Sequence, residues 1–379
     1  MADLQRDNLN QPPSTARAAF DAVWPLLAAI GVGLLFQLVL RPNLNPYTAI
    51  LMLTIGVNIV LAVSLTMVNG FTGQFSMGHA GFLAVGGYAS GIITYYGSQK
   101  LFGSGALRAG MLNGMPIDAS GLPLLGGGEW LFVIALIIGG LVSAGLGYIV
   151  GLPSLRLKGD YLAIVTLGFG EIVRVLIQQS GPVIQSPEQV KDAPLWKLPT
   201  AVGGALGFGN IPQYSSLFWV YLVAVITILV AVRLKRSSYG RAFLSIREDE
   251  IAAEAMGVNT TKFKIRAFVL AAFFAGVAGG LYGHQLGVSL SPTDAGFQKS
   301  FDFIIMVVLG GMGSISGACL AAIVVTLLPE YLRGVAEYRM VIYALALILM
   351  MIFRPQGLLG VHELWDAAFW RRKKRGGAR

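Results

Sequence analysis

The sequence predicts an all-α protein, a polytopic transmembrane helical bundle of about ten spans with both termini in the cytoplasm. One observation behind this is composition, since 55% of the 379 residues are hydrophobic and only 12% are charged. Soluble domains typically carry about 25% charged residues. The other two observations are the number of long apolar runs and the distribution of lysine and arginine. Together they point away from water as the main solvent, and the basic charge balance does not indicate a nucleic-acid partner.

Ten apolar segments are predicted to cross the membrane. A span needs about 20 mostly apolar residues, because a helix rises about 1.5 Å per residue across roughly 30 Å of hydrocarbon. Unbroken apolar runs predict helices, since backbone polar groups in lipid must be bonded internally. The expected spans are residues 20–40, 47–68, 79–97, 130–151, 160–180, 216–233, 264–284, 296–312, 314–331 and 338–354.

The eighth and ninth of these spans are the weakest predictions. The glycine-rich link between them, Leu309 to Gly317, is typical either of a cytoplasmic turn or of a re-entrant loop. Elsewhere, pairs of glycines on one helix face predict close helix packing. These pairs are Gly87/Gly91, Gly147/Gly151, Gly276/Gly280 and Gly279/Gly283.

The chain is expected to have three parts: a cytoplasmic N-terminal segment (1–19), a membrane domain (20–354) and a basic cytoplasmic tail (355–379). The first apolar run is longer than a typical signal-peptide core, and no small-residue cleavage site follows it. We therefore expect a retained first span.

The orientation is predicted from lysine and arginine, because cytoplasmic loops carry the excess of both. With both termini inside, 19 of the 28 basic residues lie in cytoplasmic segments and seven in external ones. The tail would then contact anionic lipid. Two long external segments, Ser98 to Glu129 and Gly181 to Ser215, are either a docking surface for a partner or plain connections.

The first motif is NGFTGQFSMGHAGF, Asn69 to Phe82. It places Asn69, Gln74, Ser76 and His79 beside four glycines at a membrane boundary. Irregular backbone at membrane depth is tolerated only where protein or a water-filled cavity surrounds it. One interpretation is therefore a gate or the lining of a pathway. The other is a helix start whose free N–H groups are capped by Ser76 or His79.

The second motif is LRLKGDYLAIVTLGFGEIVRVLIQQ, Leu155 to Gln179. If Asp160 marks the cytoplasmic start, Glu171 lies about 16 Å further along the helix, near the bilayer centre. An ionisable residue at that depth indicates a functional site by default. Arg174 is one turn away and can pair with Glu171. A pathway role and a neutralised structural pair both remain open.

The third motif is the charged loop from Arg233 to Phe268. Its middle, Ser245 to Met256, has the apolar spacing of a short helix, and Gly257 supplies a C-terminal stop. Such a helix projects into the cytoplasm, where an energising partner can push on it; an amphipathic linker lying on lipid is the alternative. The residues expected on its exposed side are Arg247, Glu248, Asp249, Glu250 and Glu254.

The sequence does not predict an enzyme. It has no G-x-x-x-x-G-K-[ST] phosphate loop, no paired catalytic carboxylates and no Gly-x-Ser-x-Gly elbow. The three histidines, His79, His284 and His362, lack metal-ligand spacing. No catalytic residue, metal or cofactor is therefore expected.

Together these motifs resemble a known family, the M-type permease subunits of branched-chain amino acid ABC importers. The likeness runs from Asn69 to Gly360. The matching elements are NGFTGQFSMGHAGF, LKGDYLAIVTLGFGEIVR, GRAFLSIREDEIAAEAMGVNTTKFKIRAF continuing into AGVAGGLYG, VLGGMGSISG and FRPQGLLG. The resemblance implies an inner-membrane importer with a second homologous permease, two cytoplasmic ATPases and a periplasmic substrate-binding protein. It also implies that residues 20–354 are the permease domain, that 233–266 is the coupling loop, and that Arg247 to Gly257 docks into the ATPase.

Two features depart from the family pattern. The E-A-A coupling pattern is degenerate, because Ile251 separates Glu250 from Ala252, and the segment after Gly181 lacks a T-G-G-P-N-G-type stretch. Branched-chain amino acids are the first expectation for the substrate, with urea, amides and aromatic or dicarboxylic acids as alternatives for the same machine. The rivals from other classes are a secondary transporter, with Glu171 and His79 as its ion or proton site, and a non-transporting membrane scaffold.

Overall fold

A computed structural model of the chain describes residues 15–102, 127–154, 161–285, 287–335, 338–354, 356–360 and 363–364. Within these ranges every regular element is a helix, apart from one isolated bridge between Phe208 and Leu290. This confirms the all-α prediction. Most of the N-terminal segment, the middle of the first external segment (103–126), His362 and the tail from residue 365 lie outside the described residues.

Each predicted span coincides with a helix. The helices are α2 (Thr15–Leu35, continued by η2, Phe36–Leu40), α3 (Pro46–Leu65, continued by η4, Thr66–Gly70), α4 (His79–Phe102), α5 (Gly127–Ser154), α6 (Tyr161–Gln178), α8 (Leu217–Arg236), α11 (Thr260–Gly283), α12 (Phe297–Gly310), α13 (Ile315–Tyr331) and α14 (Arg339–Phe353).

Six stretches in the described part of the chain are long and apolar enough to cross a membrane. These are Trp24–Asn43, Pro46–Gly70, Gly127–Ser154, Tyr161–Gln178, Leu217–Arg236 and Thr260–Gly283. With 14 and 17 residues, α12 and α13 extend about 21 Å and 25 Å, less than a full hydrocarbon core. The count of ten spans therefore stays a prediction.

The centre of the bundle is formed where α4, α5 and α11 pack against one another. Glycine permits this close approach, as the glycine pairs predicted. A Cβ on Gly279 would lie 1.9 Å from the carbonyl oxygen of Leu83, and one on Gly86 would lie 2.2 Å from the Cα of Gly276. Any larger residue at these positions would force α4 and α11 apart.

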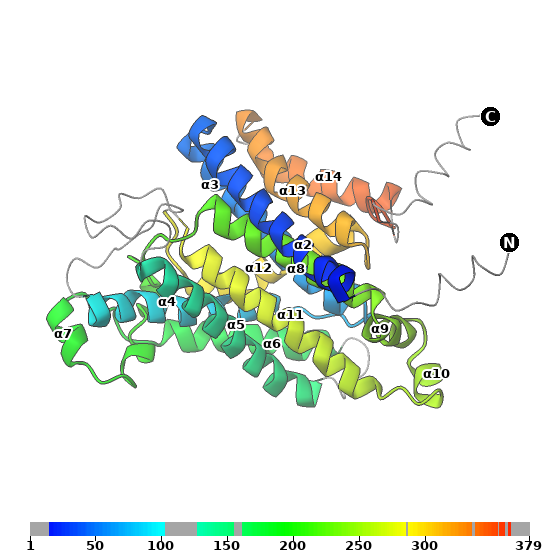
Figure 1. The fold of residues 1–379 in the computed structure, drawn as a ribbon, viewed down its shortest axis with the longest axis horizontal. Coiled ribbons are helices and arrows are strands. Elements are labelled where there is room, and N and C mark those ends of the chain that lie inside the picture. Colours follow the sequence, from blue (N-terminus) through cyan, green and yellow to red (C-terminus); the bar gives the residue numbers. More distant parts are fainter. Residues whose placement is uncertain are drawn as a thin grey trace.

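The coupling loop and the second external segment lie at opposite ends of the long axis (Figure 1). At one end are α9 (Ser238–Glu248) and α10 (Glu250–Ala255), and at the other is α7 (Pro187–Asp192). Two segments predicted on the external side also contact each other. The N–H of Ser215, at the end of the second external segment, donates to the carbonyl of His284, at the end of α11, at 3.1 Å. Predicted inside and outside segments therefore separate in space. Which end faces the cytoplasm stays a prediction.

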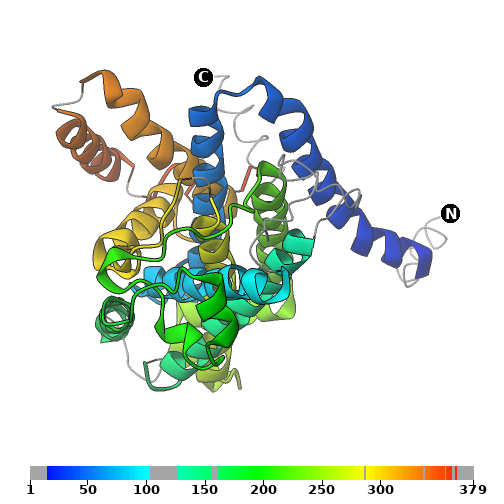
Figure 2. The same cartoon turned by 90° about the vertical axis from the view of Figure 1, so that its left-hand side faces the viewer.

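Two parts of the fold lie at opposite flanks of this bundle. Figure 2 shows α2 on one flank and the α13–α14 pair on the other. α2 with η2 packs on α8, where the ring of Phe36 stacks on Tyr221 with a centroid distance of 3.9 Å. On the opposite flank, α12 and α13 contact α3.

Candidate functional site

The middle of the coupling loop contains two helices, and the single helix expected from Ser245 to Met256 is wrong. The chain breaks at Asp249, whose backbone is extended with φ −157°. The Asp249 carboxylate accepts hydrogen bonds from the N–H groups of Ile251 at 2.9 Å and Ala252 at 3.0 Å. Aspartate satisfies the free donors of a helix start, so this residue ends α9 and begins α10.

Gly257 follows the C-cap residue of α10 and stops the helix, as predicted. Its φ is +84°, a conformation that glycine adopts without steric cost. The Gly257 N–H donates to the Glu254 carbonyl at 2.9 Å, and the Val258 N–H donates to the Ala253 carbonyl at 3.0 Å. This capping arrangement holds the tip of the loop in one shape.

The charged residues of the loop divide into two groups. Glu248, Asp249 and Glu254 are exposed, as expected. Glu250 instead forms a 2.6 Å ion pair with Lys264, whose side chain is only 7% exposed. Arg247 is also half-buried. The prediction that these two face outward is wrong, because partners distant in sequence draw them toward the bundle.

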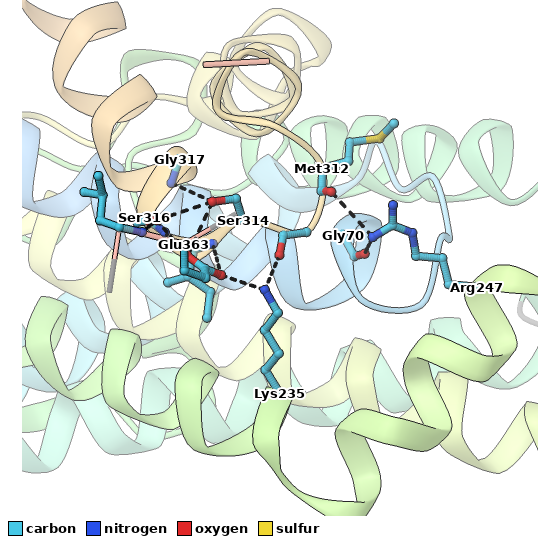
Figure 3. A network of polar contacts seen from close by, with 11 residues as sticks. Gly70, Lys235, Arg247, Met312, Ser314, Ser316, Gly317 and Glu363 are labelled. Atoms are coloured by element: carbon cyan, nitrogen blue, oxygen red, sulfur yellow. Dashed lines mark hydrogen bonds and ion pairs between the residues drawn. The ribbon is translucent and has the colours of Figure 1, made fainter. Parts of the chain in front are cut away.

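Arg247 connects the coupling loop to two other segments of the bundle (Figure 3). Its Nη1 donates to the Gly70 carbonyl at 2.9 Å and to the Met312 carbonyl at 3.5 Å. Gly70 ends the η4 extension of α3, and Met312 lies in the link between α12 and α13. We call this three-residue contact the Arg247 clamp.

Lys235 and Glu363 hold the same link from the other side (Figure 3). The Lys235 ammonium donates to the Gly313 carbonyl at 2.7 Å and to Glu363 Oε1 at 2.6 Å. Glu363 also accepts from the N–H groups of Ile315 and Ser316 at the start of α13, where negative charge is favourable. Burial alone would raise the pKa of Glu363, but these hydrogen bonds bring that pKa below its usual value.

Two large apolar side chains are exposed at the tip of the loop. Ile251 is 74% exposed and Met256 is 84% exposed. Sequence reasoning missed them as candidates and chose the carboxylates around them. The available signal was the degeneracy of the E-A-A pattern, because the residue that interrupts it is Ile251. Two large apolar side chains this exposed in one short segment make the tip a candidate contact surface.

The four candidate side chains of the first motif are all buried. Asn69 accepts a hydrogen bond from the Ser76 N–H at 3.2 Å, Gln74 accepts one from Thr72 at 3.3 Å, and His79 Nε2 lies 2.8 Å from Ser64 Oγ. The motif is thus a packed segment between α3 and α4. None of its four candidate side chains lines the cavity described below, and a gating role stays a prediction.

The start of α4 is capped by neither Ser76 nor His79. Thr166 Oγ1 of α6 accepts from the Met77 N–H at 3.0 Å, and Ser300 Oγ of α12 accepts from the Ala80 N–H at 3.2 Å. This type of cap joins three helices at one point. It could not be read from the motif because both acceptors lie far away in sequence.

Glu171 and Arg174 form the predicted pair. Arg174 Nε donates to Glu171 Oε2 at 2.6 Å, and the two side chains are 34% and 35% exposed. The Phe297 N–H, at the start of α12, donates to Glu171 Oε1 at 3.3 Å. The pair therefore lies on the surface at the junction of α6 and α12.

A cavity of about 250 Å³ lies between α3, α11, α12 and α13. Sequence reasoning did not identify it. Its polar wall contains Asn58, Tyr282, Lys299, Asp302 and Thr326. These residues come from four helices that are far apart in the sequence, so no local motif marks them.

Comparison with known proteins gives the family. The family model described as "Branched-chain amino acid transport system / permease component" matches residues 47–353. The chain belongs to this permease family. No solved structure matches it at a significant level.

Two relatives show how far the likeness extends. The permease is 35% identical over 317 residues to the high-affinity branched-chain amino acid transport system permease protein LivM of Salmonella typhimurium, covering 79% of this chain and 67% of that protein. It is also 27% identical over 312 residues to the high-affinity branched-chain amino acid transport system permease protein LivH of the same organism. That likeness covers 80% of this chain and 92% of LivH. The permease is thus a multi-pass inner-membrane transport protein, and its family is not one of enzymes.

Proposed function

We propose that this permease is one of two homologous membrane subunits of an ATP-driven importer, and that it moves branched-chain amino acids into the cytoplasm. The observation that carries the proposal is the family match over residues 47–353. The relatives LivM and LivH are both named as permease proteins of high-affinity branched-chain amino acid transport. The end that bears the coupling loop is the cytoplasmic one in this proposal, in agreement with the lysine and arginine distribution.

The charged surface of α6 and α12 supports a second permease as partner. Glu171 and Arg174 are about a third exposed, and Lys299 and Asp302 also lie at the surface of the chain. Ionisable side chains at membrane depth face protein or water-filled cavities and avoid lipid. A homologous subunit that covers this surface would place these charges between the two permeases.

The tip of the coupling loop supports docking of an ATPase. Exposed Ile251 and Met256 would be the apolar anchors, and the exposed carboxylate of Glu248, at the end of α9, would belong to the polar rim. Interfaces typically bind through a few such anchors surrounded by polar contacts. The Asp249 and Gly257 caps hold the tip rigid, and rigidity is needed if a movement of the ATPase is to be transmitted.

The Arg247 clamp gives that movement a path into the membrane. Arg247 holds the end of α3 and the link between α12 and α13. These three helices form most of the cavity wall. A displacement of the coupling loop would therefore act directly on the helices around the cavity.

The opposite end supports docking of a substrate-binding protein. Three large apolar residues of the segment from Gly181 to Ser215 are strongly exposed there: Leu195 at 72%, Trp196 at 81% and Leu206 at 95%. Beneath them, buried side chains such as Val190 and Phe208 form a small core. The segment is thus a folded platform, which fits a docking surface better than a plain connection.

The proposal is tested by affinity purification of the tagged permease from membranes of its native host in mild detergent. We expect a second permease of the same family and an ATPase to copurify in defined proportions. The complex should hydrolyse ATP, and the permease stripped of its partners should not. Recovery of the permease as a functional transporter without any ATPase would contradict the proposal and favour a secondary transporter.

A further inference from the structure

The cavity between α3, α11, α12 and α13 is lined by both charged and apolar side chains, which we call its charged wall and its apolar wall. On the charged wall, Lys299 and Asp302 are one helical turn apart on α12. Residues three apart share a helix face, so both side chains border the same space. The cavity, at about 250 Å³, is smaller than the usual 300–1,000 Å³ of drug-sized sites. It therefore suits a small ligand.

The two charged groups make no ion pair with each other within 4.0 Å in the described part of the chain. Lys299 Nζ lies 4.0 Å from Asp294 Oδ1 and 5.3 Å from the centre of the Tyr282 ring. Asp302 makes no hydrogen bond or ion pair within 4.0 Å with any described residue. Asp302 is exposed at the surface of the chain, so its carboxylate is accessible to a ligand. This arrangement leaves an acceptor for a cation and, one turn away, a donor for an anion.

The apolar part of the lining comes mainly from α3, α4 and α12. Leu61, Leu83, Phe303 and Met306 are nearly completely buried by the bundle and line the cavity. Asn58 Nδ2 donates to Thr326 Oγ1 at 2.9 Å, so these polar groups are already paired. The cavity thus combines a cationic group, an anionic group and an apolar surface of aliphatic, aromatic and thioether side chains.

We propose that this cavity is a transit site for the amino acid, in which Asp302 binds the α-ammonium group, Lys299 binds the α-carboxylate and the apolar wall receives the aliphatic side chain. A zwitterion brings one charge of each sign, so Lys299 and Asp302 each gain an oppositely charged partner while the net charge of the site is unchanged. The site opens on the surface proposed to face the second permease. This inference rests on the proposed function and adds the place where the substrate is held.

The test is photolabelling of the purified importer complex with photo-leucine, the diazirine analogue of leucine, in the absence of the binding protein. We expect labelled peptides from α3, α12 and α13, with labelling suppressed by excess L-leucine. Asp302→Asn and Lys299→Gln should each reduce labelling about tenfold, since each removes one charged hydrogen bond. As a matched control, Glu330→Gln and Arg333→Gln alter an acid and a base with the same spacing that pair at 3.3 Å near the end of α13, and should leave labelling unchanged.

Competing ligands separate a binding role from a structural one. Leucinol lacks the carboxylate, so its competition should be insensitive to Lys299→Gln. The α-hydroxy analogue of leucine lacks the ammonium group, so its competition should be insensitive to Asp302→Asn. The transit site would be overturned if either substitution abolished competition by both analogues alike. Labelling of the wild-type complex away from these helices would overturn it as well. The wild-type labelling map decides the matter even if a variant fails to assemble.

The outcome is separable from that of the proposed function. A complex that copurifies with its ATPase and transports leucine, but whose labelling is unchanged by both substitutions, rejects only the transit site. A wild-type complex that neither contains an ATPase nor transports leucine rejects the proposed function.

Discussion

An importer that carries Arg247→Gln is expected to assemble and hydrolyse ATP, yet to lose at least about nine-tenths of its amino acid uptake. The substitution removes the charged donor that joins the coupling loop to the carbonyls of Gly70 and Met312. A hydrogen bond from a charged group contributes about 1.5–3 kcal/mol, and about 1.4 kcal/mol corresponds to a factor of ten. Uptake and ATP hydrolysis measured on the same purified complex would show this uncoupling as a fall in their ratio.

The matched control for this prediction is Arg241→Gln. Arg241 lies on the same helix but is exposed, and its Nη2 donates to the Ser238 hydroxyl three residues earlier. It should leave the uptake-to-hydrolysis ratio within about twofold of wild type, because exposed local contacts contribute little. Equal ratios for the two variants would show that Arg247 does not transmit force.

The double variant Ile251→Asp, Met256→Asp is expected to separate the ATPase from the membrane subunits. These side chains are the apolar anchors of the proposed docking surface, and interface anchors typically contribute at least about 2 kcal/mol each. That corresponds to about 30-fold weaker binding for each residue. Copurification of the ATPase with the tagged permease is the measurement, at matched permease levels in the membrane.

Glu248→Gln is the control for the docking surface. Glu248 is an exposed carboxylate directly before the cap of α10, and exposed charges usually contribute about 0–1 kcal/mol. It should leave copurification nearly unchanged. If Glu248→Gln releases the ATPase while the double apolar variant retains it, the docking surface is electrostatic, as the carboxylates of the loop suggested from sequence alone.

The helices of this fold could be predicted well from sequence because the signal is local. Apolar runs of about 20 residues predict helices in lipid, and each predicted range coincides with a helix. Capping by Gly257 was also predictable, since a positive φ strongly favours glycine. The number of complete crossings was harder, because α12 and α13 are apolar but short.

The site residues were less predictable because their roles depend on contacts between distant segments. Arg247 and Glu250 look like surface charges in a solvated helix, yet Gly70 and Lys264 draw them inward. Lys299 and Asp302 form a charged wall only when α3 and α13 lie opposite them. The helix break at Asp249 could have been predicted, because the preference of aspartate for helix N-caps is a local signal. The prediction of one continuous helix did not use it.

The central claim, that this permease carries branched-chain amino acids at the expense of ATP, is tested most directly by uptake of labelled L-leucine into proteoliposomes. The vesicles contain this permease, the second permease and the ATPases, with ATP inside and the binding protein outside. The account predicts accumulation of leucine that stops when ATP or this permease is left out. Leucine accumulation by this permease alone, driven by an ion gradient and indifferent to ATP, would contradict it.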